Sequence, residues 1–503
     1  MMVRFEIDDV ADFVVVGTGA GGATAARVLS AAGHSVVMLE EGGWLRSQER
    51  PRDMVGAMAD AMRDAGAQAT RDAAPMPLLQ GVAVGGSTAI NSGIIWRLPE
   101  DVREEWAREH GLSELVDARA LDGAFDAIER DLEVSETAEE LLGRNGALMR
   151  QAAEARGLPG RAMVRNSKRC EGSGECLQGC RTEARRSMDV SYVPMALRDG
   201  ARLHTHCRVH SVERRWGRAV GVVGDVLDAQ RKPRARFRVR ARRGVIVAAG
   251  VLHTPLILLR SGLRGPVGQR FQAHPGSAVV GRFSEPVGRG PGATQAYEIP
   301  MRAQGFKIES LAMPPEMLSA RLPGVGAEWL ERLAHLDHHA HWVAQCRFEA
   351  HGRVRVGFDG RPAVTYHPTA RDVRVLLDGL ALVAELLFEV GAQEVYPGVH
   401  GVPEVLRSID EVRALRNPAL ARGDLHMVAS HLFGTAVAGR SARASVVDPA
   451  LEAHALRGLF VMDASVFPTN LGVNPQHSIM GVVHRASSQL ANRERVGGRR
   501  RAS

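Results

Sequence analysis

A glycine-rich turn near the N-terminus carries the residues best suited to chemistry in the first part of the chain. Residues 13–16 are apolar and β-branched, which predicts a strand buried on both faces, and they lead directly into a GxGxxG sequence. Gly17 permits the tight turn, Gly19 lets the backbone approach a pyrophosphate, and Gly22 allows close packing of the following helix. The pyrophosphate would lie on the positive N-terminus of that helix, next to Ala20. The spacing therefore predicts a dinucleotide-binding site.

An acidic residue follows at the distance that such a site requires. Residues 23–32 are rich in alanine and predict a helix that stops at Gly33, and residues 36–39 predict a second buried strand. Glu40, at the end of that strand, can accept hydrogen bonds from both ribose hydroxyls of an adenosine and disfavours a 2′-phosphate. The unit by itself leaves FAD and NAD open.

The length and composition indicate a globular protein of more than one domain. A chain of 503 residues exceeds one ordinary core, and 45% apolar and 24% charged residues are average values. No apolar run reaches the roughly 18 residues needed to cross a bilayer. The N-terminus carries acids where a signal peptide needs basic and apolar segments. We expect a cytoplasmic protein without a membrane span, and peripheral membrane association stays open.

Two local excesses of arginine account for much of the net charge of +7. Arginines at alternate positions in 234–242 predict one face of a strand, with Phe237 and Val239 on the other. Aromatic residues make up only 5% of the chain and no recognition-helix pattern is present, so we predict no nucleic-acid partner. We interpret the arginines as a solvated strand face that discourages edge-to-edge pairing. Residues 496–503 predict a basic tail beyond the last ordered segment.

The cysteines and a histidine-rich stretch are the potential metal ligands. There are five cysteines, an odd number, which together with the missing secretion signal favours reduced thiols. Cys170, Cys176 and Cys180 cluster without the spacing of a zinc site, which favours a glycine-rich loop over a zinc site or a redox pair. The histidines of residues 335–341 have no supporting Cys or Glu pattern. We therefore predict no metal site.

Four further segments, in order and spread through nearly the whole chain, resemble the glucose–methanol–choline (GMC) family of FAD-dependent alcohol oxidoreductases. The first is residues 81–93, where Gly85, Gly86, Ser87 and Asn91 resemble the GGSSxxN segment that lies along the flavin. Glycines and small hydroxyl residues allow a backbone to run close to a flat ring and its phosphates. The resemblance implies FAD rather than NAD.

The second segment, residues 245–255, resembles the family's stretch beside the FAD ribose, at Ala249 and Gly250. Upstream of it, Val209 matches the strand whose backbone meets the adenine. Near the C-terminus, Asp463 and Ala464 match a pair that lies near the flavin. The resemblance implies that all of these residues bind the cofactor.

The third and fourth segments supply the reacting groups that the resemblance implies. His431 begins an HxxGT sequence, and Asn474 and Pro475 form the Asn-Pro that reaches the reacting centre. Oxidation of an alcohol by hydride transfer requires a base for the hydroxyl proton, and histidine has a suitable pKa. The resemblance assigns His431 as the base and Asn474 as the partner of the substrate oxygen. His477 is close enough in sequence to line the same cavity, whereas His253, His274 and His484 have no motif that supports a role.

The sequence departs from the family's pattern in ways that bear on the cofactor and the substrate. Some members attach FAD covalently through a histidine before the Asn of the GGSSxxN segment. Ile90 occupies that position here, so we expect non-covalent FAD. The family often continues after HxxGT with Met-Gly, where this chain has Ala438 and Gly439. Asn474, rather than a histidine, is similar to the choline- and sterol-oxidising branches.

The predicted architecture is an α/β Rossmann-like FAD domain with a discontinuous α+β substrate domain built on an antiparallel sheet. We place the FAD domain at 1–275, with substrate-side insertions around 95–165, and its C-terminal return at 441–495. The substrate domain spans 276–440. Residues 352–358 predict one of its strands, and residues 373–390 predict a helix packed on the sheet.

The predicted activity is FAD-dependent oxidation of an alcohol to an aldehyde or ketone. The Cys170 loop resembles that of bacterial members related to long-chain alcohol and sterol oxidases, which implies a hydrophobic alcohol. Oxygen, a quinone or a redox protein would accept the electrons. Two alternatives remain, an NAD-dependent dehydrogenase and a flavoprotein without catalytic activity.

Overall fold

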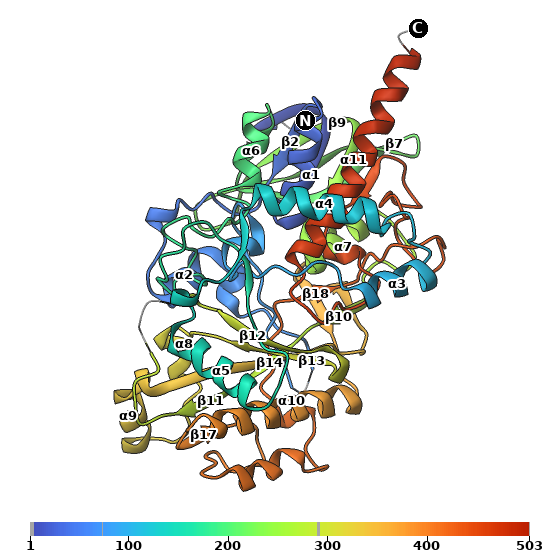
Figure 1. The fold of residues 1–503 in the computed structure, drawn as a ribbon. Coiled ribbons are helices and arrows are strands. Elements are labelled where there is room, and N and C mark those ends of the chain that lie inside the picture. The colour runs from blue at the N-terminus through green and yellow to red at the C-terminus, as the bar shows by residue number, and fades with distance from the viewer. Residues whose placement is uncertain (1–4, 73, 289–291, 502–503) are drawn as a thin grey trace.

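Two sheets with helices packed against them organise the computed structural model, which describes residues 5–72, 74–288 and 292–501. Figure 1 shows one sheet in the upper part of the molecule and the other in the lower part, resting on the long helix α10 (Ala370–Glu389). Within the described residues the upper sheet has seven strands: β1 (Ile7–Val16), β2 (Val36–Leu39), β6 (Arg202–His204), β7 (Cys207–Arg215), β8 (Arg218–Leu227), β9 (Pro233–Val247) and β19 (Leu459–Val461).

The predicted strand–turn–helix–strand unit is confirmed and lies in the middle of the upper sheet. β1 pairs in parallel with β2 on one side and with β9 on the other. The helix α1 (Ala20–Ala31) begins immediately after Gly19, earlier than the alanine-rich stretch suggested, because the glycine turn itself enters the first helical turn. The carboxyl ends of these parallel strands therefore lie on the same side of the sheet, together with the glycine turn.

The arginine-rich segment is the strand β9, and its predicted place in the sheet is wrong. Its first half pairs with β8 and its last residues pair with β19, while β1 lies along its other side. β9 is therefore an interior strand, and its arginines do not protect a sheet edge from pairing. The arginines form ion pairs with acids of neighbouring parts of the sheet: Arg240 pairs with Asp8 on the adjacent strand β1, and Arg238 pairs with Glu213 on β7, beyond β8. Cross-strand pairing explains the alternation.

The lower sheet is antiparallel, as predicted, and has six strands within the described chain. In spatial order these are β17 (Glu394–Tyr396), β11 (Gly276–Arg282), β14 (His339–Cys346), β13 (Phe306–Ser310), β12 (Tyr297–Met301) and β4 (Arg161–Ala162). The predicted helix is α10, whose N-terminus has a capping box between Thr369 and Asp372. Because β4 comes from the region around 95–165, that region contributes a strand to the lower sheet.

The predicted strand at 352–358 exists but lies in another sheet than expected. β15 (Gly352–Val356) joins β16 (Pro362–Thr365), β10 (Gln269–Ala273) and β18 (Leu432–Phe433) in a small sheet. Alternation identifies a strand but does not identify its partners. The antiparallel pairing of β10 with β18 has a direct consequence, because it sets the residue after β10 beside the residue before β18.

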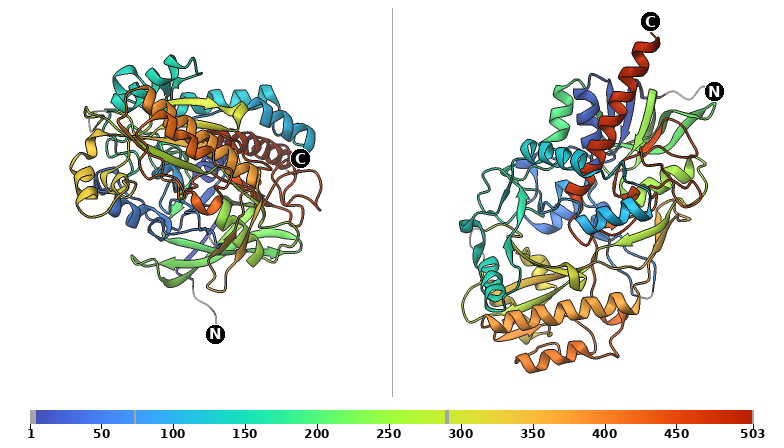
Figure 2. Two further views of the ribbon diagram at one scale, coloured as in Figure 1. Left: turned by 90° about the horizontal axis from the view of Figure 1, so that it is seen from below. Right: turned by 45° about the vertical axis from the view of Figure 1, so that its right-hand side comes forward.

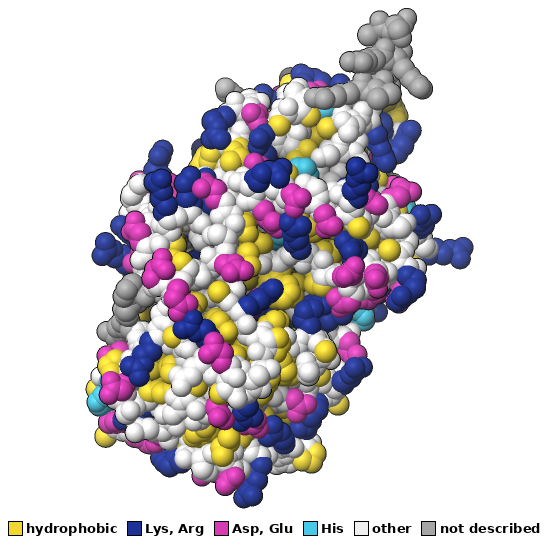
Figure 3. Space-filling model, viewed as in Figure 1, with side chains coloured by type: hydrophobic (Ala, Val, Ile, Leu, Met, Phe, Trp, Pro, Cys, Tyr) yellow, Lys and Arg dark blue, Asp and Glu magenta, His cyan; other side chains and the backbone are white. Residues whose placement is uncertain are grey.

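The C-terminal helix α11 (Gln476–Arg501) runs past α1 and projects from the upper part of the molecule (Figure 2). The prediction of a tail leaving the last ordered segment at 496 is therefore wrong as far as Arg501, and residues 502–503 lie outside the described residues. Cationic and anionic side chains are interspersed on the face shown in Figure 3. Among the helices of the described chain, none is both long and apolar enough to cross a membrane.

Candidate active site

One cavity of about 1570 Å³ brings together most of the residues predicted to bind the cofactor or react. The predicted residues in its lining are Gly17, Gly19, Ala20, Glu40, Gly86, Ser87, Asn91, Val209, Ala249, Gly250, His431, Asp463, Ala464, Asn474 and Pro475. Gly22 and Gly85, which we also predicted as cofactor-binding, are not in the lining. A Cβ on Gly22 would lie 2.0 Å from the carbonyl oxygen of Gly17, so its role is to pack helix on strand.

The three glycines at positions 17, 19 and 21 differ in the space around them. Only Gly19 faces open space that a ligand could occupy, whereas Gly17 and Gly21 have no room for a side chain. A Cβ on Gly17 would lie 2.3 Å from the Ala248 oxygen, and one on Gly21 would lie 1.9 Å from the Met462 oxygen. A Cβ on Gly19 would meet no atom of the described chain closer than 3.9 Å, and this residue caps α1 without a side-chain hydrogen bond. The open space in front of the helix N-terminus fits a pyrophosphate.

Glu40 lies at the adenosine end of the cradle, where burial raises the pKa of its carboxyl group. One of its oxygens accepts hydrogen bonds from the Thr18 amide and hydroxyl, and the other accepts one from the Gly42 amide at 3.0 Å. The second oxygen retains a free acceptor site for a ribose hydroxyl. Arg63, paired with Glu41 at 2.8 Å, also lines this end, and the glycine motif gave no signal for it.

The loop that contains Cys170 and Arg185 holds residues 81–93, the segment predicted to lie along the flavin, by hydrogen bonds to its backbone. The buried guanidinium of Arg185 donates to the carbonyls of Ala89 and Cys176, at 2.8 Å and 2.7 Å, and to that of Asn91. Burial alone would raise the pKa of the Cys176 thiol, but the nearby Arg165 and Arg185 lower it below its ordinary value. All five cysteines are free, and no cluster of three or more potential metal ligands occurs in the described residues.

His431 is paired with a second histidine that we had not assigned to the site. Because β10 and β18 are antiparallel, His274 donates its backbone amide to the His431 carbonyl at 2.9 Å. Their rings are stacked, with Nδ1 of one 3.1 Å from Nδ1 of the other, and both residues line the cavity. Burial, and then the charge of Lys307, lowers the pKa of His431 to about 3. His431 is therefore neutral at physiological pH.

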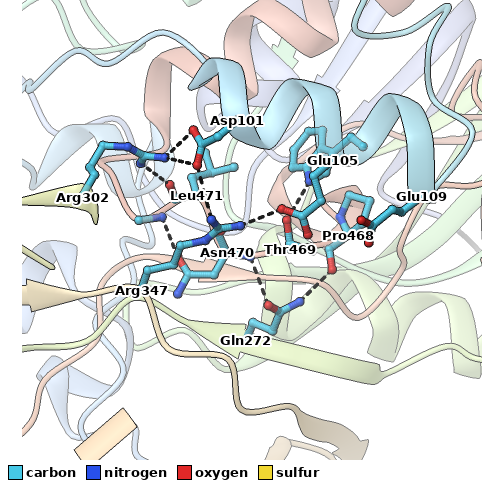
Figure 4. A network of polar contacts seen from close by, with 12 residues as sticks. Asp101, Glu105, Glu109, Gln272, Arg302, Arg347, Pro468, Thr469, Asn470 and Leu471 are labelled. Carbon is cyan, nitrogen blue, oxygen red and sulfur yellow. Dashed lines mark hydrogen bonds and ion pairs between the residues drawn. The ribbon is translucent and has the colours of Figure 1, made fainter. Parts of the chain in front are cut away.

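Asn474 lines the cavity at the end of an irregular segment. A polar network, shown in Figure 4, fixes the residues of this segment that precede Asn474. Arg302 donates to the Leu471 carbonyl at 2.7 Å, and Arg347 donates to the Asn470 carbonyl at 2.9 Å. Gln272, two residues before His274, donates to the Pro468 carbonyl and accepts from the Asn470 amide. The same network therefore connects the segment that carries His274 with the segment that carries Asn474.

His477 does not line the cavity, contrary to our prediction. Its Nε2 lies 2.9 Å from a carboxylate oxygen of Glu129, on the side where Phe125 packs against its ring. Three residues after Asn474, it has already entered α11, and the helix turns it into the protein. Gln476 faces the cavity instead and accepts a hydrogen bond from Asn91 at 2.6 Å.

Methionines line another part of the cavity wall. Met54 and Met58 lie on α2 (Met54–Ala61), and Met62 follows that helix directly. Met317 lies on α8 (Pro315–Ser319), and Met313 precedes that helix. Met54, Met58, Met62 and Met317 pack together in one cluster with Ile90 and Leu177. Unbranched thioether side chains adapt to irregular apolar ligands.

The glycine cradle and the histidine pair line one cavity, as a dinucleotide-dependent oxidoreductase requires. Two family models, both described as GMC oxidoreductase, match residues 11–276 and 349–482. The chain therefore belongs to the GMC oxidoreductase family of FAD-binding enzymes. This membership removes the alternative of an NAD-dependent dehydrogenase.

Similar proteins span almost the whole chain. A GMC-type oxidoreductase of Mycobacterium tuberculosis is 36% identical over 95% of this chain and 75% of its own length. A long-chain-alcohol oxidase of Arabidopsis thaliana is 28% identical over 96% of this chain and 67% of its own length. Among solved structures, formate oxidase has a TM-score of 0.74 at 17% identity, covering 97% of this chain and 99% of that one. The last comparison shows the shared fold.

Proposed function

We propose that the protein oxidises an alcohol to an aldehyde or ketone, with His431 accepting the hydroxyl proton and Asn474 holding the substrate oxygen. The observation that carries this proposal is the convergence of His431, Asn474 and the dinucleotide cradle on one cavity. In the reaction the oxygen loses a proton, the carbinol carbon loses a hydride, and a C=O double bond forms. FAD, when bound, accepts the hydride at N5 of its flavin ring.

The chain's own residues would hold FAD without a covalent bond. The cradle formed by Gly17, Gly19 and the N-terminus of α1 suits the pyrophosphate, and Glu40 suits the ribose. Ile90, in the cavity wall, has no nucleophilic atom to attach to the ring. The Asp463 carboxylate accepts hydrogen bonds from the Gly250 amide and the Thr254 hydroxyl, so it fixes the turn before α7 (Gly250–Arg260). Ala464 follows directly and would lie near the flavin.

The low pKa of His431 keeps its imidazole unprotonated, which is the form that can accept a proton, and it makes His431 a weaker base than a histidine with the ordinary pKa. One Nδ1 of the histidine pair must carry the hydrogen between them. We assign that hydrogen to His431, so that His274 accepts it and Nε2 of His431 keeps a lone pair for the substrate. In this arrangement His274 sets the tautomer and orientation of the base.

The methionine-lined wall favours a hydrophobic alcohol over a free sugar. A long-chain-alcohol oxidase among the relatives agrees with this substrate class. Oxygen, a quinone or a redox protein would re-oxidise the flavin. A cytoplasmic location and peripheral membrane association stay predictions.

Anaerobic mixing of the purified holoenzyme with a long-chain primary alcohol, a sterol and a sugar tests this proposal. We expect the long-chain alcohol or the sterol to bleach the visible flavin absorbance and the sugar to leave it unchanged. Admission of air, or of a quinone, then identifies the acceptor. Failure of every alcohol to bleach bound FAD would instead support a flavoprotein without this catalytic activity.

A further inference from the structure

A fully buried lysine lies directly behind Asn474, on the side away from the cavity. The side chain of Lys307, on β13, has no solvent exposure. Its ammonium group donates to an oxygen of Glu298 at 2.6 Å and to Oδ1 of Asn474 at 2.7 Å, and lies 2.7 Å from an oxygen of Glu309. The ammonium therefore donates two hydrogen bonds and forms a further ion pair with Glu309, and of these three partners Asn474 alone lines the cavity.

The charges around Lys307 are energetically unfavourable in the interior of a sheet. Glu298 and Glu309 lie directly opposite each other on β12 and β13, and both are buried. Like charges at such positions are destabilising unless a cation lies between them. Apolar residues of similar volume are often as stable as a buried ion pair, so packing alone does not require this one. Two contacts lead from these charges to the cavity. Glu309 accepts a hydrogen bond from Gln295 at 2.6 Å, and Lys307 donates to Asn474, the residue we propose to hold the substrate oxygen.

Lysine fixes which end of the Asn474 amide faces the substrate. An ammonium group can only donate, so the atom of Asn474 next to it must be the oxygen. The amide nitrogen is then directed away from Lys307 and is left to donate. Without Lys307, the two ends of the amide would have similar shape and no charge would choose between them.

We propose that Lys307 is a positioning residue that holds Asn474 by its oxygen, so that the Asn474 amide nitrogen donates a hydrogen bond to the substrate oxygen as its proton leaves. This inference rests on the proposed alcohol oxidation. The Lys307 cation also polarises the amide, which strengthens the bond to an oxygen that gains negative charge. Its charge lowers the pKa of His431 in addition, after the larger effect of burial.

The test compares the Lys307→Met/Glu309→Gln double variant with Glu309→Gln alone. The double variant removes one positive and one negative charge together, and Glu298 keeps its ion pair with Arg161 at 2.8 Å. We expect the limiting rate of flavin reduction by alcohol to fall about 10- to 100-fold relative to Glu309→Gln, with a smaller change in KM. We also expect weaker binding of an aliphatic carboxylate, whose oxygen resembles the deprotonated substrate, and unchanged binding of the matching alkane.

A double-mutant cycle separates positioning from a general structural role. If Lys307 acts through Asn474, its removal should have almost no further effect on the rate when Asn474→Ala is already present. An equal fold-loss in both backgrounds, or equal rates in the double variant and Glu309→Gln, would overturn the proposal.

A second variant leaves Lys307 in place and covers the case in which the double variant does not fold. Asn474→Asp keeps an oxygen for Lys307 but presents another acceptor to the substrate, so we expect a loss of about 100-fold with FAD retained. Wild-type rates in Asn474→Asp would overturn the proposal. If the wild-type enzyme reduces no alcohol, the proposed function fails first. If it reduces alcohols and the double variant matches Glu309→Gln, the inference about Lys307 alone fails, whereas a wild-type rate in Asn474→Asp would also remove the proposed role of Asn474.

Discussion

The cofactor cradle and the His431–Asn474 region occupy one cavity but are built in opposite ways. The cradle comes from one continuous stretch, in which β1, the glycine turn, α1 and β2 follow each other directly. The His431–Asn474 region, which we propose as the reacting region, is assembled from side chains far apart in the chain: His274 after β10, Lys307 on β13, His431 before β18 and Asn474 before α11.

The two regions also differ in what specifies them. The cradle depends on the absence of side chains, because at Gly17 and Gly21 a Cβ would collide with the backbone that directly follows β9 and β19. The reacting region depends on the presence of polar side chains that hold each other in place, such as Lys307 on Asn474. We therefore expect changes in the cradle to prevent FAD binding, and changes in the reacting region to leave FAD bound but slow the chemistry.

The largest effect is expected from Gly21→Ala in the cradle. The new Cβ would lie 1.9 Å from the Met462 carbonyl oxygen, so α1 and the chain before Asp463 could not both keep their positions. We expect little or no FAD-containing protein, measured as visible absorbance relative to protein absorbance. Gly123→Ala is the matched control, because Gly123 is also helical, within α4 (Ala118–Asp131), but its Cβ would meet nothing within 4 Å. The control should gain stability, by about 1 kcal/mol.

His431→Ala should slow flavin reduction by alcohol about 10²- to 10⁴-fold, because it removes the proton acceptor. FAD should remain bound, since the cradle is untouched. Rapid-mixing measurement of flavin absorbance without oxygen gives the rate. The exposed His335→Ala serves as the control and should react at the wild-type rate. An undiminished rate in His431→Ala would remove His431 from the mechanism.

His274→Ala should lower the same rate by a smaller factor, roughly 10- to 100-fold, because the base remains but its ring is no longer fixed. His274→Gln offers an oxygen in place of Nδ1 and should recover part of the loss. Equal rates for the alanine and glutamine variants would show that the 3.1 Å contact with His431 does not matter for catalysis.

Arg347→Met tests whether the network in Figure 4 matters for Asn474. The change removes the 2.9 Å bond to the Asn470 carbonyl and the ion pair with Glu105. We expect a loss of about tenfold or less in the limiting rate, with FAD retained, since a small displacement of a reacting group is enough to slow a reaction. Arg371→Met removes an exposed arginine paired with Glu349 and should have no effect.

Acid should destabilise the fold through histidines that are neutral in the folded protein. In the folded protein the pKa is about 3 for His253, His341 and His431 and about 4 for His339, against an ordinary value of 6.5. The unfolded chain then binds more protons below 6.5, so stability is complete above that pH and is lost as the pH falls toward the folded values. We expect Tm to decrease over this range. His339→Gln should show a smaller decrease, and an equal slope would exclude His339 as a contributor.

The same contrast explains what the sequence could and could not reveal. The cradle is local, so spacing alone predicted its two strands and its helix correctly and placed Glu40 at the end of the second strand. His431 and Asn474 were predicted from their motif context, but His274 was set aside because nothing near it in sequence marks it. Its place depends on the pairing of β10 with β18, which no local pattern encodes.

Lys307 and His477 illustrate the same limit. Lys307 stands within an ordinary strand pattern, and only the approach of β12 and of the segment before α11 gives its charge a partner. His477 is near Asn474 in sequence, but the start of α11 turns it toward Glu129. The arginines of β9 indicated a strand face correctly, while the strands on either side of it came from distant parts of the chain.

The most direct test of the account follows flavin absorbance while the holoenzyme meets, without oxygen, a long-chain alcohol deuterated at its carbinol carbon. We predict complete bleaching that is slower than with the undeuterated alcohol, because the carbinol hydride is transferred to the bound flavin. Bound FAD that stays oxidised with both alcohols, or bleaching at rates that deuterium and His431→Ala leave unchanged, would contradict the account.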